Sequence, residues 1–145
     1  MELTSSAFAD GQPIPRRHSC EGEDLSPPLA WTEVPEGTSS LALIVDDPDA
    51  PSGTFTHWLG WGLDPASGGL GKGEAAPVEG RNDFGQTGYR GPCPPPGRGP
   101  HRYFFRLYAL EQERELEPGA GRGELDRALS AGSTAVAELM GTLER

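Results

Sequence analysis

Side chains that can move protons or hold an anion gather in three segments of the sequence. The segments are Asp46-Asp47-Pro48-Asp49-Ala50-Pro51, then His57-Trp58, then Gly91-Pro92-Cys93-Pro94-Pro95 leading to His101-Arg102-Tyr103. Histidine, aspartate and tyrosine together are adequate parts for general acid–base chemistry. Each segment lies at the end of an expected strand or in a long loop beside one, which is where binding sites usually lie.

No familiar catalytic motif accompanies these residues. A Gly-x-Ser-x-Gly elbow is missing, and Gly71-Lys72-Gly73 lacks the Ser or Thr of a phosphate-binding loop. Asp83-Phe84-Gly85 is like a kinase metal motif, but the other kinase motifs are missing. We therefore predict a protein that is not an enzyme and that uses no cofactor and no metal.

The two cysteines, Cys20 and Cys93, allow three interpretations. With His18 and His101 they could supply four zinc ligands, but the spacing is not a usual structural zinc pattern. They could also be two small buried thiols, or a disulfide, which a cytoplasmic location disfavours as the resting state. Because both cysteines sit in loops beside the same expected pocket, we expect them to lie near each other.

Three stretches have the pattern of β-strands. Residues 41–46 form a short apolar run, typical of a central strand buried on both faces. Residues 54–61 are rich in β-formers, and alternation places Phe55, His57, Leu59 and Trp61 on one side. Residues 101–110 alternate most clearly, with His101, Tyr103, Phe105, Leu107 and Ala109 on one face and two arginines, Arg102 and Arg106, on the other.

The end of the chain has a helical pattern. Apolar residues recur at three- and four-residue steps in 124–129 and 134–143, with Gly132 between them, which predicts two short helices. Strands followed by helices predict an all-β-dominated fold, a sheet sandwich with short C-terminal helices; the family resemblance described below makes this a two-sheet antiparallel β-sandwich. A length of 145 residues suits one domain, residues 1–145.

Charge and hydropathy exclude several classes of partner. The chain has 12 Lys and Arg against 22 Asp and Glu, a net charge of −10, with no basic cluster, so nucleic-acid binding is not expected. The first residues lack the pattern of a signal peptide, and no apolar stretch approaches the length of a membrane span. We expect a cytoplasmic protein without stable membrane insertion.

The order of several motifs resembles one known family. Asp47-Pro48-Asp49-Ala50-Pro51 is similar to a signature of the phosphatidylethanolamine-binding protein family, in its bacterial and archaeal Raf kinase inhibitor-like branch. Residues 88–95 and 99–103 resemble its second signature, and further matches lie in 25–31, 82–85 and 138–141. The resemblance implies two antiparallel sheets, a C-terminal helical region and a small anion pocket. It also suggests a cis bond between Ala50 and Pro51.

The resemblance assigns the pocket to eight ligand-binding residues: Asp47, Asp49, Pro51, His57, Gly91, Pro95, His101 and Tyr103. Two imidazoles and the Tyr103 hydroxyl can donate hydrogen bonds to an anion, and backbone N–H groups around Gly91 can complete a concave nest. Asp47 would orient and charge a histidine, or share a proton with the ligand, which predicts tighter anion binding as the pH falls through the histidine range.

Three functions are compatible with these residues. The first is non-catalytic binding of an anionic group, of the phosphate, phosphoryl or carboxylate type. The second is a regulatory protein that inhibits a kinase or protease through protein–protein contact, and the third is a hydrolase without a recognised nucleophile. The resemblance also suggests a homodimer. Many relatives carry a Gly-His pair near the C-terminus, where this chain has Gly132-Ser133, so any role of that histidine is missing here.

Overall fold

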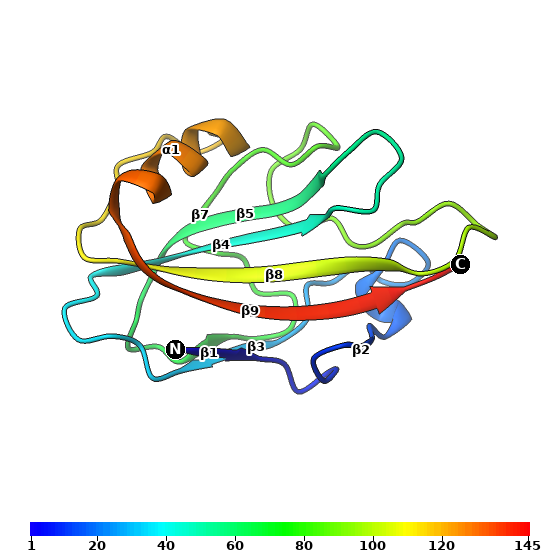
Figure 1. Ribbon diagram of the computed structural model, residues 1–145, viewed down its shortest axis with the longest axis horizontal. Helices are drawn as coiled ribbons and strands as arrows, with labels where there is room; N and C mark the ends of the chain where they lie inside the picture. Colours follow the sequence, from blue (N-terminus) through cyan, green and yellow to red (C-terminus); the bar gives the residue numbers. More distant parts are fainter.

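The computed structural model describes residues 1–145 and contains two β-sheets, one α-helix and one short 3-10 helix (Figure 1). The larger sheet has the strand order β2 (Gln12–Pro13), β9 (Ser133–Leu143), β8 (His101–Leu110), β4 (Ser40–Asp47), β5 (Phe55–Leu63), β7 (Val78–Glu79). The smaller sheet has the order β1 (Glu2–Thr4), β3 (Leu29–Thr32), β6 (Gly69–Leu70). A β-dominated fold with two sheets is therefore confirmed.

The larger sheet is mixed, so the expectation of antiparallel sheets is confirmed only in part. The short edge strand β2 runs parallel to the end of β9, while all other pairs are antiparallel. The approach to β2 is fixed by Asp10, whose carboxylate accepts the backbone N–H of Met140, and by Gly11, whose N–H donates to the Met140 carbonyl. These two bonds hold the N-terminal segment against β9, so that β2 runs parallel to it.

The predicted central strand is confirmed as β4, which lies between β5 and β8 and has all eight of its residues buried. The alternation expected for β8 is also confirmed: the five residues from His101 to Ala109 on one face are all buried. On its other face, Arg102 pairs with Asp49, and Arg106 pairs with Asp46 and Glu138.

The second predicted helix, residues 134–143, is wrong, because this segment is the long strand β9. Leu139, Gly141 and Leu143 point inward at every second position, and Val136 and Glu138 point outward. Ala, Glu, Leu and Met are good helix formers, but β8 offers ten residues of pairing to this segment. Tertiary pairing therefore overrides local propensity.

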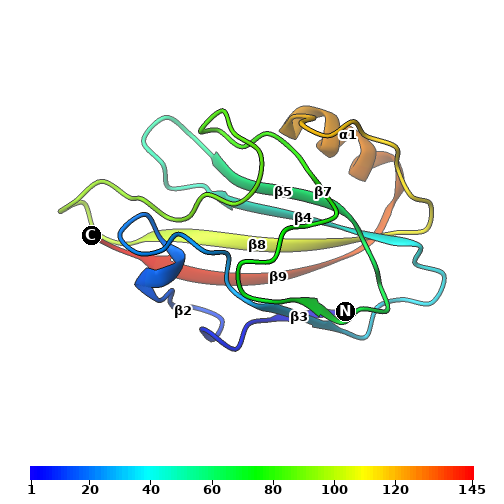
Figure 2. The same cartoon turned by 180° about the vertical axis from the view of Figure 1, so that it is seen from behind.

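The first predicted helix is confirmed as α1 (Arg122–Gly132), which ends where β9 begins. Its buried residues Leu125 and Leu129 pack on the face of the larger sheet that carries Ile44 and Leu59. The larger core lies on the opposite face of that sheet and includes residues of the smaller sheet, such as Trp31. In both views α1 and the β1–β3 pair lie on opposite sides of the central strands (Figure 2).

One short 3-10 helix, η1 (Arg16–His18), begins the loop that leads to β3. Neither helix combines the length and the apolar character that a bilayer-crossing helix needs.

Candidate functional site

A cavity of about 270 Å³ opens where β4 ends and where β5 and β8 begin. Its lining residues are Asp47, Ala50, Pro51, Phe55, His57, Phe84, Cys93, Pro94, Pro95, His101 and Tyr103. Six of the eight residues assigned from the family resemblance are among them: Asp47, Pro51, His57, Pro95, His101 and Tyr103. The three chemically active segments of the sequence thus meet at one place.

His101 is held at the cavity by a carboxylate. Its Nδ1 atom lies 2.7 Å from Oδ2 of Asp47, and both side chains are buried. The other carboxylate oxygen of Asp47 accepts the backbone N–H of Asp49 at 2.7 Å. Both oxygens of Asp47 are therefore engaged inside the protein, and Nε2 of His101 is the ring nitrogen left for a ligand.

A β-bulge brings His57 to the same cavity. The register between β4 and β5 shifts by one residue at His57. As a result His57 lines the cavity and its neighbour Trp58 lies in the larger core, whereas Leu59 and Trp61 face α1. The predicted alternation, which placed Phe55, His57, Leu59 and Trp61 on one side, is wrong because an extra residue in one strand reverses the faces beyond it.

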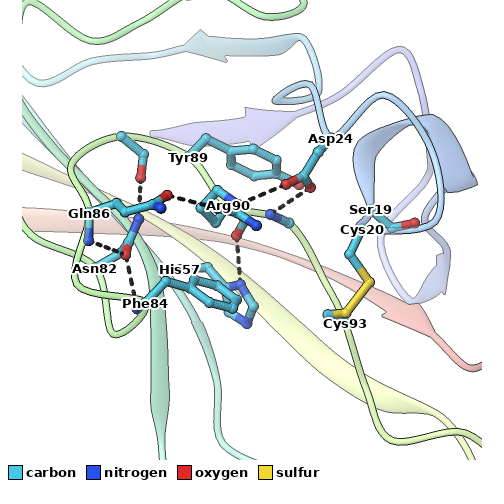
Figure 3. A network of polar contacts seen from close by, with 12 residues as sticks. Ser19, Cys20, Asp24, His57, Asn82, Phe84, Gln86, Tyr89, Arg90 and Cys93 are labelled. Atoms are coloured by element: carbon cyan, nitrogen blue, oxygen red, sulfur yellow. Dashed lines mark hydrogen bonds and ion pairs between the residues drawn. A yellow bond between two sulfur atoms is a disulfide. The ribbon is translucent and has the colours of Figure 1, made fainter.

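The ring of His57 is fixed by the backbone of Arg90. Its Nδ1–H donates to the Arg90 carbonyl oxygen at 2.6 Å, so Nε2 carries the lone pair in the neutral ring (Figure 3). Burial lowers the pKa of His57 below its ordinary value, although the Arg90 carbonyl and the charge of Asp47 oppose this effect. His57 is consequently neutral at pH 7.

Tyr103 supplies an unpaired hydroxyl. The Tyr103 side chain is buried, and its hydroxyl oxygen has no hydrogen-bond partner in the protein. Burial, followed by the charge of Asp47 and the approach of that carboxylate to the hydroxyl, raises the pKa of Tyr103, which keeps the hydroxyl protonated. Because a buried polar group without a partner is costly, a ligand oxygen that accepts a hydrogen bond from this O–H would be stabilised.

Two of the assigned residues, Asp49 and Gly91, do not line the cavity. The Asp49 carboxylate is paired with Arg102 through two guanidinium contacts of 2.9 Å, and hydrogen bonding to Arg102 lowers the pKa of Asp49 to about 2. The backbone N–H of Gly91 donates to Asp24 at 2.9 Å. These groups are engaged inside the protein, so Gly91 offers no free N–H for an anion nest.

The reason for glycine at position 91 is close packing. A Cβ atom at Gly91 would lie 2.2 Å from the carbonyl oxygen of His18 and 2.5 Å from Asp24. Gly91 therefore lets the loop before the prolines approach the loop that follows η1.

A disulfide joins the same two loops. Cys20 and Cys93 are bonded, and Cys93 also lines the cavity (Figure 3). The expectation that the two cysteines lie near each other is confirmed, and of the three open interpretations the structure has the disulfide. Bonded sulfurs cannot serve as thiolate ligands, so the zinc interpretation with His18 and His101 is wrong.

One further expectation is corrected, since every peptide bond is trans, including the bond between Ala50 and Pro51. Five lining residues were not assigned from the sequence: Ala50, Phe55, Phe84, Cys93 and Pro94. Most of them are apolar neighbours of assigned residues. Phe84 is different: residues 82–85 resemble a family motif, but the resemblance did not place Phe84 in the pocket, where the bond from the Thr56 N–H to Asp83 holds this loop against the start of β5.

The assembled groups can donate hydrogen bonds to an anion. The cavity presents two imidazole rings and one hydroxyl, but no serine, threonine or free cysteine lines it as a nucleophile. An imidazole in its protonated form and a phenol both donate to oxygen anions. This chemistry fits a small oxyanion such as a phosphate or carboxylate group.

The chain is similar to known proteins over almost its whole length. The model of the phosphatidylethanolamine-binding protein family matches residues 4–144. A UPF0098 protein of Methanothermobacter thermautotrophicus is 47% identical over 152 residues, which cover 100% of this chain and 99% of that protein.

Two solved structures have the same fold. CT736 of Chlamydia trachomatis, described as a candidate homologue of phosphatidylethanolamine-binding protein, is 42% identical and has a TM-score of 0.94, over 99% of this chain and 97% of that one. YbcL of E. coli, described as a member of the mammalian PEBP family, is 33% identical with a TM-score of 0.93, over 99% and 98%.

Proposed function

Because this chain belongs to the phosphatidylethanolamine-binding protein family, we propose that it binds an anionic group of the phosphate or carboxylate type in the cavity and catalyses no reaction. The observation that carries the proposal is the set of polar groups directed at one small volume. His57 and His101 each use Nδ1 within the protein, and the Tyr103 hydroxyl has no partner. An oxyanion satisfies all three groups.

The neutral state of His57 determines how the anion is held. A neutral ring offers a lone pair at Nε2, which repels a fully ionised oxygen. Binding therefore requires one proton, taken up by the ring or brought by the ligand, and a phosphate brings such a proton when it binds as the monoanion, the form that predominates below its second pKa near ~6. This shared proton offsets the negative charge of Asp47 beside the ligand.

The test is an NMR titration of the imidazole signals with inorganic phosphate and with O-phosphorylethanolamine. Saturable shifts of His57 and His101 are expected, with no shift of His18, the third histidine, whose Nδ1 bonds to the Leu25 carbonyl and which lies outside the cavity lining. No shift of either cavity histidine at millimolar ligand contradicts the proposal. Turnover of a generic phosphoester that disappears in His101→Ala contradicts its non-catalytic part.

The remaining expectations about partners and location stay predictions. Affinity capture with and without competing phosphate tests whether a kinase or protease docks at the cavity, and the mass of the protein in solution tests the homodimer. The proposed cytoplasmic location is tested by the thiol state of Cys20 and Cys93 in cells, because cytosolic disulfides are rare.

A further inference from the structure

The cavity has an apolar wall that a simple phosphate ion does not use. Beside its four polar residues it is lined by Ala50, Pro51, Phe55, Phe84, Pro94 and Pro95. A ligand that fills it therefore carries an apolar part beside its anionic group.

Aromatic rings line one continuous path from the floor of the cavity to its rim. The ring centroids of Tyr103 and His57 are 5.4 Å apart, and those of His57 and Phe84 are 5.6 Å apart. The ring of Phe55 contacts both of the last two, with its centroid 4.8 Å from that of Phe84 and 5.1 Å from that of His57. These spacings are typical of favourable aromatic contacts, and a planar group on the ligand would extend the same series.

Phe84 is the exposed end of this series. It is 39% exposed, and only Val136 among the large apolar side chains is also exposed. The Arg90 guanidinium carbon lies 5.1 Å from the centre of the Phe84 ring, and Arg90 is itself held by Asp24 and Gln86 (Figure 3). An exposed aromatic ring that is held in place by a cation over one of its faces offers apolar surface to a ligand.

The backbone of Phe84 is held as firmly as its ring. The buried Asn82 accepts the N–H groups of Phe84 and Gln86 with its side-chain oxygen and donates to the Gly88 carbonyl. Such an Asx turn fixes the loop before any ligand arrives. Preorganisation of this kind reduces the entropy cost of binding.

We propose that the cavity selects anions whose acidic group is attached to an aromatic ring, such as an aryl phosphate, and that Phe84 is the residue that selects them. The inference rests on the proposed function, since the polar groups of the cavity hold the anionic end. The aromatic end stacks on Phe84 and Phe55. Phosphorylethanolamine and inorganic phosphate leave this wall in contact with water, so they bind more weakly.

The test is calorimetric titration at pH 7 with phenyl phosphate, inorganic phosphate, O-phosphorylethanolamine and phenol. Phenyl phosphate is expected to bind about tenfold more tightly than either other phosphate. Phe84→Ala is expected to remove that advantage, so that the affinity for phenyl phosphate falls by more than the affinity for inorganic phosphate. The matched control is Phe104→Ala, because Phe104 also lies beneath a guanidinium, 4.6 Å from Arg106, but does not line the cavity.

The outcomes separate the two proposals. Equal affinity of the wild type for phenyl phosphate and inorganic phosphate overturns the aromatic preference and leaves the anion site intact. Equal losses for both ligands in Phe84→Ala overturn the selecting role, because a structural defect lowers both. Failure of the wild type to bind any phosphate, or equally tight binding of phenol, overturns the proposed function itself.

Discussion

Asp47 and His101 lie 54 positions apart in the sequence, yet Oδ2 of the first and Nδ1 of the second are 2.7 Å apart in a buried site. Truncation in His101→Ala leaves the buried carboxylate without this partner. We expect the free energy of unfolding at pH 7 to fall by about 2 to 3 kcal/mol. Urea unfolding of the variant and the wild type measures this loss of stability. His101→Gln, which retains a side-chain donor, should lose less, and equal losses in the two variants would show that the hydrogen bond contributes little.

The lowered pKa of His57 predicts a pH dependence of anion affinity. Acetate is a suitable probe, because simple carboxylates titrate near pH ~4 and stay ionised across the histidine range. The folded protein holds His57 neutral, and a bound anion favours its protonation, so the complex binds more protons than the free protein. Affinity therefore rises as the pH falls below ~6.5, by at most about tenfold per pH unit for one proton.

An NMR titration with acetate between pH 5 and 8 measures this dependence. In His57→Gln the side chain no longer titrates, and the contribution of His57 to the slope should disappear. If acetate affinity depends on pH to the same extent in His57→Gln and in the wild type, the proton taken up on binding belongs to another group.

Gly91 is expected to matter for stability rather than for direct ligand contact. A methyl group in Gly91→Ala would overlap the His18 carbonyl and Asp24. We expect a loss of about 2 kcal/mol in the free energy of unfolding, from overpacking. Gly123→Ala is a matched control, since its nearest neighbour is 3.7 Å away, and it should stabilise α1 by about 0.5 to 1 kcal/mol. Thermal unfolding should show a lower Tm for Gly91→Ala and a higher Tm for Gly123→Ala than for the wild type.

The disulfide is expected to be a large contributor to stability. Cys20 and Cys93 are 73 positions apart, and in the chain-entropy model closing a loop of this size stabilises the fold by about 4 kcal/mol. Urea unfolding with and without reductant measures the effect. The double variant Cys20→Ser, Cys93→Ser should be insensitive to reductant, and a wild type that is equally insensitive would contradict the prediction.

Much of the larger sheet could be predicted from sequence because β4 and β8 have patterns that only a strand satisfies. The continuous apolar run of β4 indicates burial on both faces, and the strict alternation of β8 indicates one buried face. The helix predicted for the β9 segment was wrong for a physical reason. The apolar residues of this segment fit both the helical and the strand period. The choice between helix and strand depends on the edge of β8, which is free to pair with this segment only once the rest of the sheet has formed. The local sequence of β9 contains no information about that edge.

The polar part of the candidate site was recognised from motifs, whereas its apolar part was not. The resemblance pointed to His57 and His101 as members of one pocket, and the structure brings them together. Phe84 joins them only because Asn82 folds its loop and Arg90 lies behind its ring. Asn82, Phe84 and Arg90 do not recur at a strand or helix period in the sequence. Periodicity therefore could not predict that they contact one another.

The bond between Cys20 and Cys93 also determines what a protease can remove. It closes a covalent ring that contains five of the strands, from β3 to β7, including the central strand β4. A single cut anywhere in that ring leaves both pieces attached, and all of the sheet strands remain on one molecule. Nicked protein would therefore keep its full mass on a non-reducing gel and separate into fragments only after reduction.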